Sequence, residues 1–517
     1  MNNRIQIKTD KTTYIGSLRA DGTAAFRGIC YGITPRWQRG VMAQLPETVD
    51  ASGDSIEPVQ PRGNIDEQRE DAVFLNIYLD PRYEGSRAVL VWTPVGGGIF
   101  SNGLGVVPEK FLTEDPDIID VVPNARVGIL SSLDLRDFDD AGEYGDIYKY
   151  SRNLTKTDYI LALQWIREHI ADFGGDPERV TIGGHSYGSV VTTSMLLIPE
   201  AEPYFDRAIA RSSTALDDTM LMSAQEAAYF ARKFREYSGV TMIRDALQMS
   251  VQELLDVQQR LLQIQPLTPD GDFPGIRAAS FSTVVDDVVV KEDYLTPLLK
   301  NGRSKKLIIG TTGGDSDMRS IGRAPDEVFG QFFEKYPDKA QRVSPSMAQG
   351  AYYAGHGGDE VITAMDFYCD MTFRAQAAAC AAAFDGNAYM YYYDFYLQNP
   401  EGFRAKHGSA ENAAWGRPAD TPDYMARVLR DSFAAFIRSG DPNTGNPSFE
   451  ASQGPQALGS PYREPLEWRP YTPESPWTLE FTNSGCGLRE GIRHSDLELA
   501  CCTVREYEEI MRRTGRK

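Results

Sequence analysis

The sequence predicts an α/β protein with a large, mostly parallel central sheet flanked by helices. Apolar, β-branched runs such as AVLVW at 88–92 and RVTIGG at 179–184 have the composition of buried parallel strands. Helical segments alternate with such runs across several hundred residues, and this alternation is typical of strands joined by helical crossovers.

The best-marked helix is predicted over 155–173, just before the strand at 179–184. Its sequence, TKTDYILALQWIREHIADF, repeats apolar residues at three- and four-residue spacing, which gives one face that can lie on a sheet. These residues are Ile160, Leu163, Ile166 and Ile170. A later strand is predicted at 305–312, and the alanine-rich tract at 375–384 favours helix.

The composition of the 517 residues restricts the possible partners and compartments. Lys and Arg number 53 against 73 Asp and Glu, a net charge of -20, so no basic patch is expected for nucleic acid. The first residues lack the apolar core of a signal peptide, and no run approaches the roughly 20 apolar residues that cross a bilayer. We therefore expect a cytoplasmic protein without membrane contact. The six cysteines are expected to be reduced, with one pairing near the C-terminus left open.

A nucleophile is predicted directly after the strand at 179–184. The segment GHSYG, Gly184 to Gly188, is followed by a helical run, and strand, sharp turn and helix are the context that a nucleophile elbow requires. The turn strains the backbone at the serine, and its flanking positions must be small. Ser186 is therefore the predicted nucleophile.

A serine needs a base to accept its proton, and histidine is the usual one. His169 falls in the predicted helix and His185 beside the serine, which leaves three candidates: His356, His407 and His494. All three follow Ser186, so chain order does not choose among them. His407 is favoured because it lies in a glycine-flanked loop after an apolar strand, where catalytic side chains are usually carried.

The acid that orients the base is expected in the loop after the strand at 305–312. Asp315 and Asp317 both lie there, in TTGGDSDM; for Asp317 an ordinary acidic turn is favoured. The oxyanion hole is expected in TPVGGGIF, where Gly96 to Gly98 let backbone N–H groups come close to a substrate. The amide of Tyr187 would complete it.

Motifs in family order across nearly the whole chain resemble those of the type-B carboxylesterases, the cholinesterase-like branch of the α/β-hydrolases. The most specific is WIREHIADFGGDPERVTIGGHSYG at 165–188, which resembles the family's WVxxNIxxFGGDPxxVTxxGESAG. The others are FRGICYG at 26–32, EDAVFLNIY at 70–78, FDRAIARSS at 205–213, FSTVVDD at 281–287, GTTGGDSD at 310–317 and FAAFIRSGDPN at 433–443.

The resemblance implies an α/β-hydrolase fold with a catalytic Ser186, His407 and Asp315. Asp315 stands where the family usually has glutamate, so either its loop approaches the histidine more closely or the base is held less well. An extra residue in PVGGGIF leaves open which glycines donate; Gly97 and Gly98 are favoured. Ala72 replaces the cysteine of a family disulfide, and Tyr187 replaces the usual alanine. No counterpart of the choline-binding tryptophan is evident, which disfavours choline esters.

Together these residues predict a serine carboxylesterase that hydrolyses small-molecule esters through an acyl-enzyme, with no metal and no cofactor. The chain is expected to form one α/β-hydrolase domain over 1–517, with helical substrate-pocket insertions at about 214–270 and 318–384. One alternative is a weakly active or inactive cholinesterase-like binding protein; another is a hydrolase of amides, thioesters or lactones. The natural substrate and the oligomeric state are not readable from the sequence.

Overall fold

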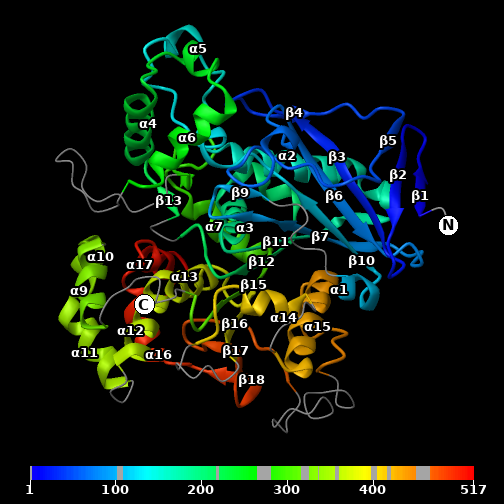
Figure 1. Ribbon diagram of the computed structural model, residues 1–517. Coiled ribbons are helices and arrows are strands. Elements are labelled where there is room, and N and C mark those ends of the chain that lie inside the picture. The colour runs from blue at the N-terminus through cyan, green and yellow to red at the C-terminus, as the bar shows by residue number, and fades with distance from the viewer. Residues whose placement is uncertain are drawn as a thin grey trace. The chain divides into compact units, whose positions relative to one another are not determined.

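The structure, a computed structural model, describes most of the chain in two compact units. The described residues are 3–101, 109–216, 220–264, 281–315, 325–335, 337–355, 360–396, 404–415, 421–449 and 466–516. Unit 1 comprises Met1–Asp206 and Thr219–Pro297, and unit 2 comprises Arg207–Asp218 and Leu298–Lys517. Figure 1 labels the helices and strands of both.

Unit 1 contains a sheet with the strand order β1-β2-β3-β6-β10-β7-β11. Neighbours from β1 to β10 are antiparallel, whereas β10, β7 and β11 run parallel. The strands are β1 (Arg4–Lys8), β2 (Thr13–Leu18), β3 (Ala24–Ile33), β6 (Ala72–Leu79), β10 (Ile118–Pro123), β7 (Arg87–Thr93) and β11 (Gly175–His185). Short β4 (Val41–Met42) pairs with β3, and β5 (Thr48–Asp50) with β2. Every residue of β7 is buried, as its apolar sequence predicts.

Two of the described helices of unit 1, α4 (Ala224–Ser238) and α6 (Val251–Leu261), begin at a side-chain cap. The others are α1 (Glu109–Glu114), α2 (Leu154–His169), α3 (Tyr187–Leu197) and α5 (Ile243–Ala246). Ser223 and Ser250 each form a capping box, with Glu226 and Glu253 respectively. α2 continues as one 3-10 turn and ends at Gly174, whose left-handed φ of 77° stops the helix.

Unit 2 contains a sheet with the strand order β12-β15-β16-β17-β18, parallel except for the last pair. These strands are β12 (Arg207–Arg211), β15 (Lys306–Thr312), β16 (Ala388–Asp394), β17 (Trp477–Thr482) and β18 (Gly485–Glu490). The helices are α7 (Leu295–Ser304, whose first residues belong to unit 1), α9 (Pro325–Lys335), α10 (Pro337–Arg342), α11 (Pro345–Gly355), α12 (Glu360–Cys369), α13 (Ala375–Ala382), α14 (Ser409–Ala414), α15 (Asp423–Ser439), α16 (His494–Cys501) and α17 (Tyr507–Arg513). None of the helices in the described ranges is long and apolar enough to cross a membrane.

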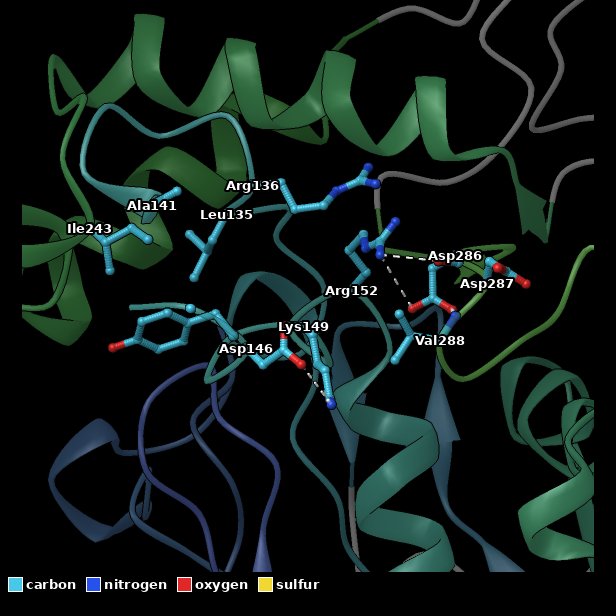
Figure 2. Close-up of a pocket in the computed structure, with 12 residues that line it drawn as sticks. Leu135, Arg136, Ala141, Asp146, Lys149, Arg152, Ile243, Asp286, Asp287 and Val288 are labelled. Carbon is cyan, nitrogen blue, oxygen red and sulfur yellow. Dashed lines mark hydrogen bonds and ion pairs between the residues drawn. The ribbon is translucent and has the colours of Figure 1, made fainter. Parts of the chain in front are cut away.

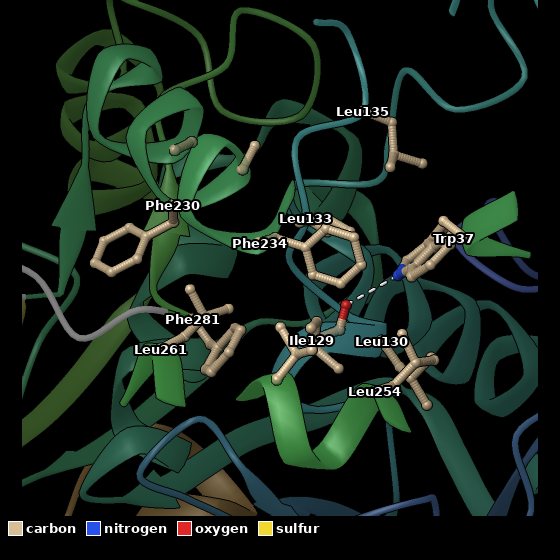
Figure 3. Packing of buried hydrophobic residues seen from close by; sticks show 14 of the residues in the cluster. Trp37, Ile129, Leu130, Leu133, Leu135, Phe230, Phe234, Leu254, Leu261 and Phe281 are labelled. Carbon is tan, nitrogen blue, oxygen red and sulfur yellow. Dashed lines mark hydrogen bonds between the residues drawn. The ribbon is translucent and has the colours of Figure 1, made fainter. Parts of the chain in front are cut away.

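A hydrophobic cluster in unit 1 fixes the short 3-10 turn η2 (Gly128–Leu130). Figure 3 shows Trp37 beside this turn, with its indole Nε1 donating to the Ile129 carbonyl at 2.9 Å. Phe234 and Phe281 belong to the same cluster, and both are nearly fully buried. The cluster matters for the site because Gly128 of this turn hydrogen-bonds to the glycine loop described below.

The structure confirms the elements that the sequence predicts. The strands predicted at 88–92, 179–184 and 305–312 lie within β7, β11 and β15, and each pairs in parallel. The helix predicted over 155–173 is α2 with its 3-10 continuation, and the four apolar residues of its stripe are buried. The alanine-rich tract forms α13.

Candidate active site

Ser186 forms the sharp turn between β11 and α3. Its φ is 57° and its ψ is -126°, a backbone conformation that residues with a Cβ rarely adopt. Strain of this kind costs on the order of 1–3 kcal/mol and persists only where the surrounding structure enforces it. The strand, turn and helix expected of a nucleophile elbow are therefore present at Ser186.

The two glycines that flank Ser186 face backbone atoms with no room for a side chain. A Cβ at Gly184 would lie 2.3 Å from the backbone C and O of Gly188. A Cβ at Gly188 would lie 2.3 Å from the carbonyl oxygen of Thr93, at the end of β7. Because the opposing atoms belong to the backbone, they cannot move aside as a flexible side chain could. The requirement for small residues at these positions, inferred from the sequence, is confirmed.

The glycine loop forms the tip of a hairpin between β8 (Val95–Gly96) and β9 (Phe100–Ser101). Gly97 and Gly98 have left-handed φ angles of 56° and 72°. The carbonyl of Gly98 accepts a hydrogen bond from the N–H of Gly128 at 2.8 Å. The loop is therefore attached to the 3-10 turn that the hydrophobic cluster holds.

The glycine loop also packs against the residue that follows Ser186. A Cβ at Gly98 would lie 3.1 Å from the ring of Tyr187. Tyr187 is the first residue of α3, so its amide N–H has no intrahelical acceptor. In the described ranges, no turn or loop hydrogen bond uses the backbone N–H of Gly97, Gly98 or Tyr187. These three amides are the donors that the sequence predicts for an oxyanion hole, and the assignment stays a prediction.

Asp315 and His407 are brought together within unit 2, whereas Ser186 and the glycine loop belong to unit 1. The carboxylate Oδ1 of Asp315 lies 2.8 Å from Nδ1 of His407. The same carboxylate accepts hydrogen bonds from the hydroxyl of Thr312 at 2.6 Å and from its backbone N–H at 2.8 Å. The Asp315 side chain is fully buried, and the imidazole is 34% exposed. A buried, fully hydrogen-bonded carboxylate is suited to orienting an imidazole whose far edge is accessible.

The two loops that carry this pair are joined through their backbones. Gly314 and Lys406 form a parallel β-bridge, and the N–H of Gly314 donates to the carbonyl of Ala405 at 2.8 Å. Of the two alternatives left by an aspartate at this position, a closer loop or a less well held base, the bridge and the 2.8 Å contact between Asp315 and His407 favour the closer loop.

Arg404 anchors the histidine loop to a buried ionic network. Its guanidinium pairs with Asp366 at 2.7 Å and also contacts Asp394, at the end of β16. The other oxygen of Asp394 accepts the N–H of Ala405 at 3.2 Å. The chain from 404 to 406 is therefore fixed on both sides just before His407.

The environment shifts the pKa of both members of the pair. Burial by itself would raise the pKa of Asp315, but the hydrogen bond and charge of His407, with Thr312, lower it below the usual value. Burial by itself would lower the pKa of His407, but the hydrogen bond and charge of Asp315 raise it above the usual value. The pair therefore favours a charged carboxylate and a more basic imidazole, as a general base requires.

Of the other candidate residues, the structure describes His169 and His494 but not His356 and Asp317. His169 ends α2, and its ring lies 4.8 Å from that of Trp165, so it is part of the packing as expected. His494 begins α16, whereas the sequence had suggested a polar tail; a helix forms there because Leu497 and Ala500 are buried. His356 and Asp317 lie outside the described residues. No group of three or more His, Cys, Asp or Glu side chains among the described residues could hold a metal ion.

Sequence reasoning missed three residues that shape the site. They are Thr312, which bonds both oxygens of Asp315, Arg404, which anchors the histidine loop, and Lys156, whose Nζ lies 3.1 Å from the phenol of Tyr187. Lys156 could have been noticed in the sequence. It is a lysine on a helix face that otherwise carries apolar and small residues and is predicted to be buried. Arg404 gave no local signal, since Asp366 lies 38 residues away in the sequence. Thr312 lies only three residues before Asp315, and its role depends on the turn between them.

Comparison with known proteins gives a consistent result. Residues 11–500 match the carboxylesterase family. The para-nitrobenzyl esterase of Bacillus subtilis (strain 168) is 24% identical over 493 residues, 87% of this chain and 92% of that protein. The liver carboxylesterase of Sus scrofa is 27% identical over 418 residues, covering 72% and 70%.

Solved structures show the same fold. A Geobacillus stearothermophilus carboxylesterase has a TM-score of 0.76 at 21% identity, covering 96% of this chain and 99% of that one. A para-nitrobenzyl esterase has a TM-score of 0.72 with the same coverage. The predicted fold class, α/β-hydrolase, is therefore confirmed. Because the family match runs through almost the whole sequence, the chain belongs to the carboxylesterase family.

Proposed function

We propose that the protein is a serine carboxylesterase with Ser186 as nucleophile, His407 as general base and Asp315 as the group that orients the base. In the first step the Oγ of Ser186 attacks the ester carbonyl carbon while Nε2 of His407 takes its proton. The N–H groups of Gly97, Gly98 and Tyr187 stabilise the negative charge that develops on the carbonyl oxygen. His407 then returns the proton to the departing alcohol, which leaves an acyl group on Ser186.

The second step repeats the same chemistry with water. His407 takes a proton from a water molecule, whose oxygen attacks the acyl carbon, and the bond to Ser186 breaks as its oxygen regains the proton. The products are one carboxylic acid and one alcohol. The scheme uses only side chains and backbone amides of this chain.

The observation that carries the proposal is the strained backbone of Ser186. A positive φ at a serine, between two glycines that tolerate no Cβ, is the backbone geometry that a nucleophile elbow requires. It places the partly buried Ser186 between the end of β11 and the first backbone N–H of α3. The hydrogen bond between Asp315 and His407 supports the same mechanism. The comparisons favour the esterase over a binding protein without catalysis.

The test uses Ser186→Ala with p-nitrophenyl and p-nitrobenzyl acetates as substrates. We expect hydrolysis to fall to the level of a blank, with an unchanged thermal unfolding midpoint, because the hydroxyl is lost and the turn is kept. A fluorophosphonate probe should label wild type, and mass spectrometry should find the adduct on the peptide with Ser186. Ser238→Ala, which removes a hydroxyl at the end of α4, is the matched control and should be labelled normally. Undiminished hydrolysis by Ser186→Ala would rule out the proposal.

For the substrate, we propose small, uncharged esters. The similarity to a para-nitrobenzyl esterase supports aromatic alcohols, and a net charge of -20 disfavours anionic substrates. We propose that helices α4 to α6, and α9 to α13, contribute the walls of the acyl and alcohol pockets. Rates across a series of acyl chain lengths and aromatic alcohols would define the preference. The cytoplasm stays the proposed compartment, to be tested by cell fractionation.

A further inference from the structure

Lys156 is a buried lysine beside the residue that follows Ser186. Only 2% of its surface is exposed, and its Nζ lies 3.1 Å from the phenol oxygen of Tyr187. Within the described part of the chain, it forms no ion pair with a carboxylate. An ammonium group buried without an acid is unfavourable, and burial lowers the pKa of Lys156 to about 7. A group kept in so costly a position is a candidate for a functional role.

The phenol of Tyr187 connects this lysine to the segment that begins at Phe281. Its hydroxyl donates to the carbonyl of Phe281 at 2.5 Å. Because that hydroxyl has only one proton, its oxygen accepts the hydrogen bond from Lys156. Burial raises the pKa of Tyr187, so the phenol is neutral and the direction of the two bonds is fixed. The result is a buried chain from amine to phenol to carbonyl.

The two ends of this chain are joined by contacts that do not involve Tyr187. Asn153, which caps α2, donates to the carbonyl of Val284 at 2.8 Å and accepts its N–H at 3.0 Å. Figure 2 shows the neighbouring contact, in which Arg152 donates to the carbonyl of Asp286 at 3.2 Å. The start of α2 and the segment from Phe281 to Asp286 are therefore tied together. Lys156 and the Phe281 carbonyl, which both hydrogen-bond to the phenol of Tyr187, therefore belong to two segments that are fixed to each other.

The ring of Tyr187 transmits this support to the glycine loop. A Cβ at Gly98 would lie 3.1 Å from the ring and 3.1 Å from the Phe281 carbonyl oxygen, so Gly98 rests on both. Gly97 and Gly98 have no side chains of their own to fix them, and glycine backbones are flexible. Aimed N–H groups are effective only when they are fixed before the charge develops. The Tyr187 side chain therefore connects the turn at Ser186 to the glycine loop.

We propose that Lys156 and the phenol of Tyr187 are positioning residues of the oxyanion hole, which hold the Gly97–Gly98 amides and the Tyr187 amide in register. The inference rests on the proposed function, since it concerns the same site. Lys156 acts through Tyr187 and touches neither substrate nor reacting atoms. Its role is to keep the phenol in the one orientation that supports both Gly98 and the Phe281 carbonyl.

The test compares Lys156→Met and Tyr187→Phe with wild type on p-nitrophenyl acetate. We expect kcat to fall by about 10-fold or more in each, with KM changed less than 2-fold, because the loss affects the transition state. A trifluoromethyl ketone, which forms a tetrahedral adduct, should bind more weakly by a similar factor. The double variant should lose no more than either single variant, since the two groups act as one unit. The acid limb of the pH profile should not move, because His407 and Asp315 are untouched.

Stability distinguishes positioning from a structural role. Lys156→Met replaces a buried amine with an apolar side chain of similar length, so its unfolding midpoint should be equal to or above that of wild type. The matched controls are Lys149→Met, whose side chain is 40% exposed, and Tyr159→Phe, which loses a hydroxyl that donates to the Val91 carbonyl at 3.0 Å. Both controls should keep their kcat. The Tyr159 control shows the effect of losing a buried phenol bond elsewhere on α2.

Four outcomes separate the hypotheses. A reduced kcat at an undiminished midpoint supports the inference. A full kcat in Lys156→Met and Tyr187→Phe, with Ser186→Ala inactive, overturns it while the proposed function stands; so does a loss of activity that only follows a lower midpoint. Activity retained in Ser186→Ala would overturn the proposed function itself.

Discussion

Nδ1 of His407 lies 2.8 Å from Oδ1 of Asp315, and the carboxylate that accepts this hydrogen bond is fully buried. The β-bridge between Gly314 and Lys406 joins the two loops one residue before each partner. The acid and the base therefore belong to one rigid element, and the distance between them depends on backbone pairing. Five predictions follow from this element, from the loop that carries His407 and from the turn at Ser186.

The pH dependence of hydrolysis should report the shifted pKa of His407. A general base works when it is deprotonated, so kcat/KM should rise with pH through the pKa of His407. That pKa is raised by Asp315, and the midpoint of the acid limb should therefore lie above pH 6.5. Initial rates from pH 5 to 9 at low substrate concentration measure it.

Asp315→Asn should move this limb to lower pH and reduce kcat. The hydrogen bond to the charged carboxylate and its charge are lost, and burial, which lowers the pKa of His407, is left unopposed. The loss in kcat should approach ~10⁴-fold, because the imidazole is no longer held in the correct tautomer. Asp385→Asn, at a side chain that is 62% exposed, is the control. It should change neither the midpoint of the acid limb of the pH profile nor kcat. A limb that stays in place in Asp315→Asn would show that His407 is not the titrating base.

Asp315→Glu should lower activity, although the resemblance to type-B carboxylesterases places glutamate at this position. The buried carboxylate is fixed by Thr312 and by the bridge between the loops, so an added methylene would displace it from these partners. We expect kcat to fall by about 10-fold and the unfolding free energy by about 1–3 kcal/mol. Steady-state kinetics with urea unfolding test both. An increase in kcat would mean that the loops can separate.

Gly188→Ala should destabilise the fold as well as abolish activity. Its Cβ would lie 2.3 Å from the Thr93 carbonyl oxygen, so β7 and α3 must move apart. Overpacking against backbone should cost about 3 kcal/mol. Gly142→Ala places a Cβ in open space at an exposed turn and should be neutral in unfolding and in rate. Equal midpoints for the two variants would contradict the close contact described here.

Arg404→Met should reduce activity through the histidine loop. The substitution leaves Asp366 and Asp394 buried with fewer cationic partners, which should cost about 3 kcal/mol of stability. The folded fraction should still turn over substrate more slowly, because Ala405 and Lys406 are less well fixed. Arg489→Met, which removes a half-exposed partner of Glu480, should change stability by less than about 1 kcal/mol. Kinetics at 15 °C and thermal unfolding separate the two effects.

The fold could be predicted in its parallel strands because those strands are buried on both faces. β7 and β15 each contain a run of consecutive apolar residues, and α2 carries an apolar stripe. The local sequence was therefore sufficient to predict these three elements. The antiparallel strands β1, β2, β3 and β6 were not predicted. In β1 to β3 burial alternates or is interrupted, as in the exposed and half-exposed residues of β1. β6 is buried throughout, but its antiparallel pairing with β3 and β10 depends on partners distant in the sequence.

The candidate site could be predicted where one segment determines the chemistry. The turn at Ser186 needs glycine on both sides, so Gly184 and Gly188 were informative without knowledge of the rest of the chain. The pairing of Asp315 with His407 required a resemblance, because 92 residues separate them and chain order left three histidines. Lys156 and Arg404 were missed because their partners Tyr187 and Asp366 are brought near only by folding, and Thr312 was missed because its bonds to Asp315 depend on the turn between them.

The backbone contacts of Gly184 and Gly188 also bear on how the protein could be adapted to new substrates. A side chain that collides with another side chain can be accommodated by a compensating substitution, but no substitution removes a carbonyl group from the main chain. Random libraries that include these two codons would therefore consist largely of misfolded clones. Diversity is better placed in the helices between residues 224 and 261, which the proposed function assigns to the walls of the substrate pocket.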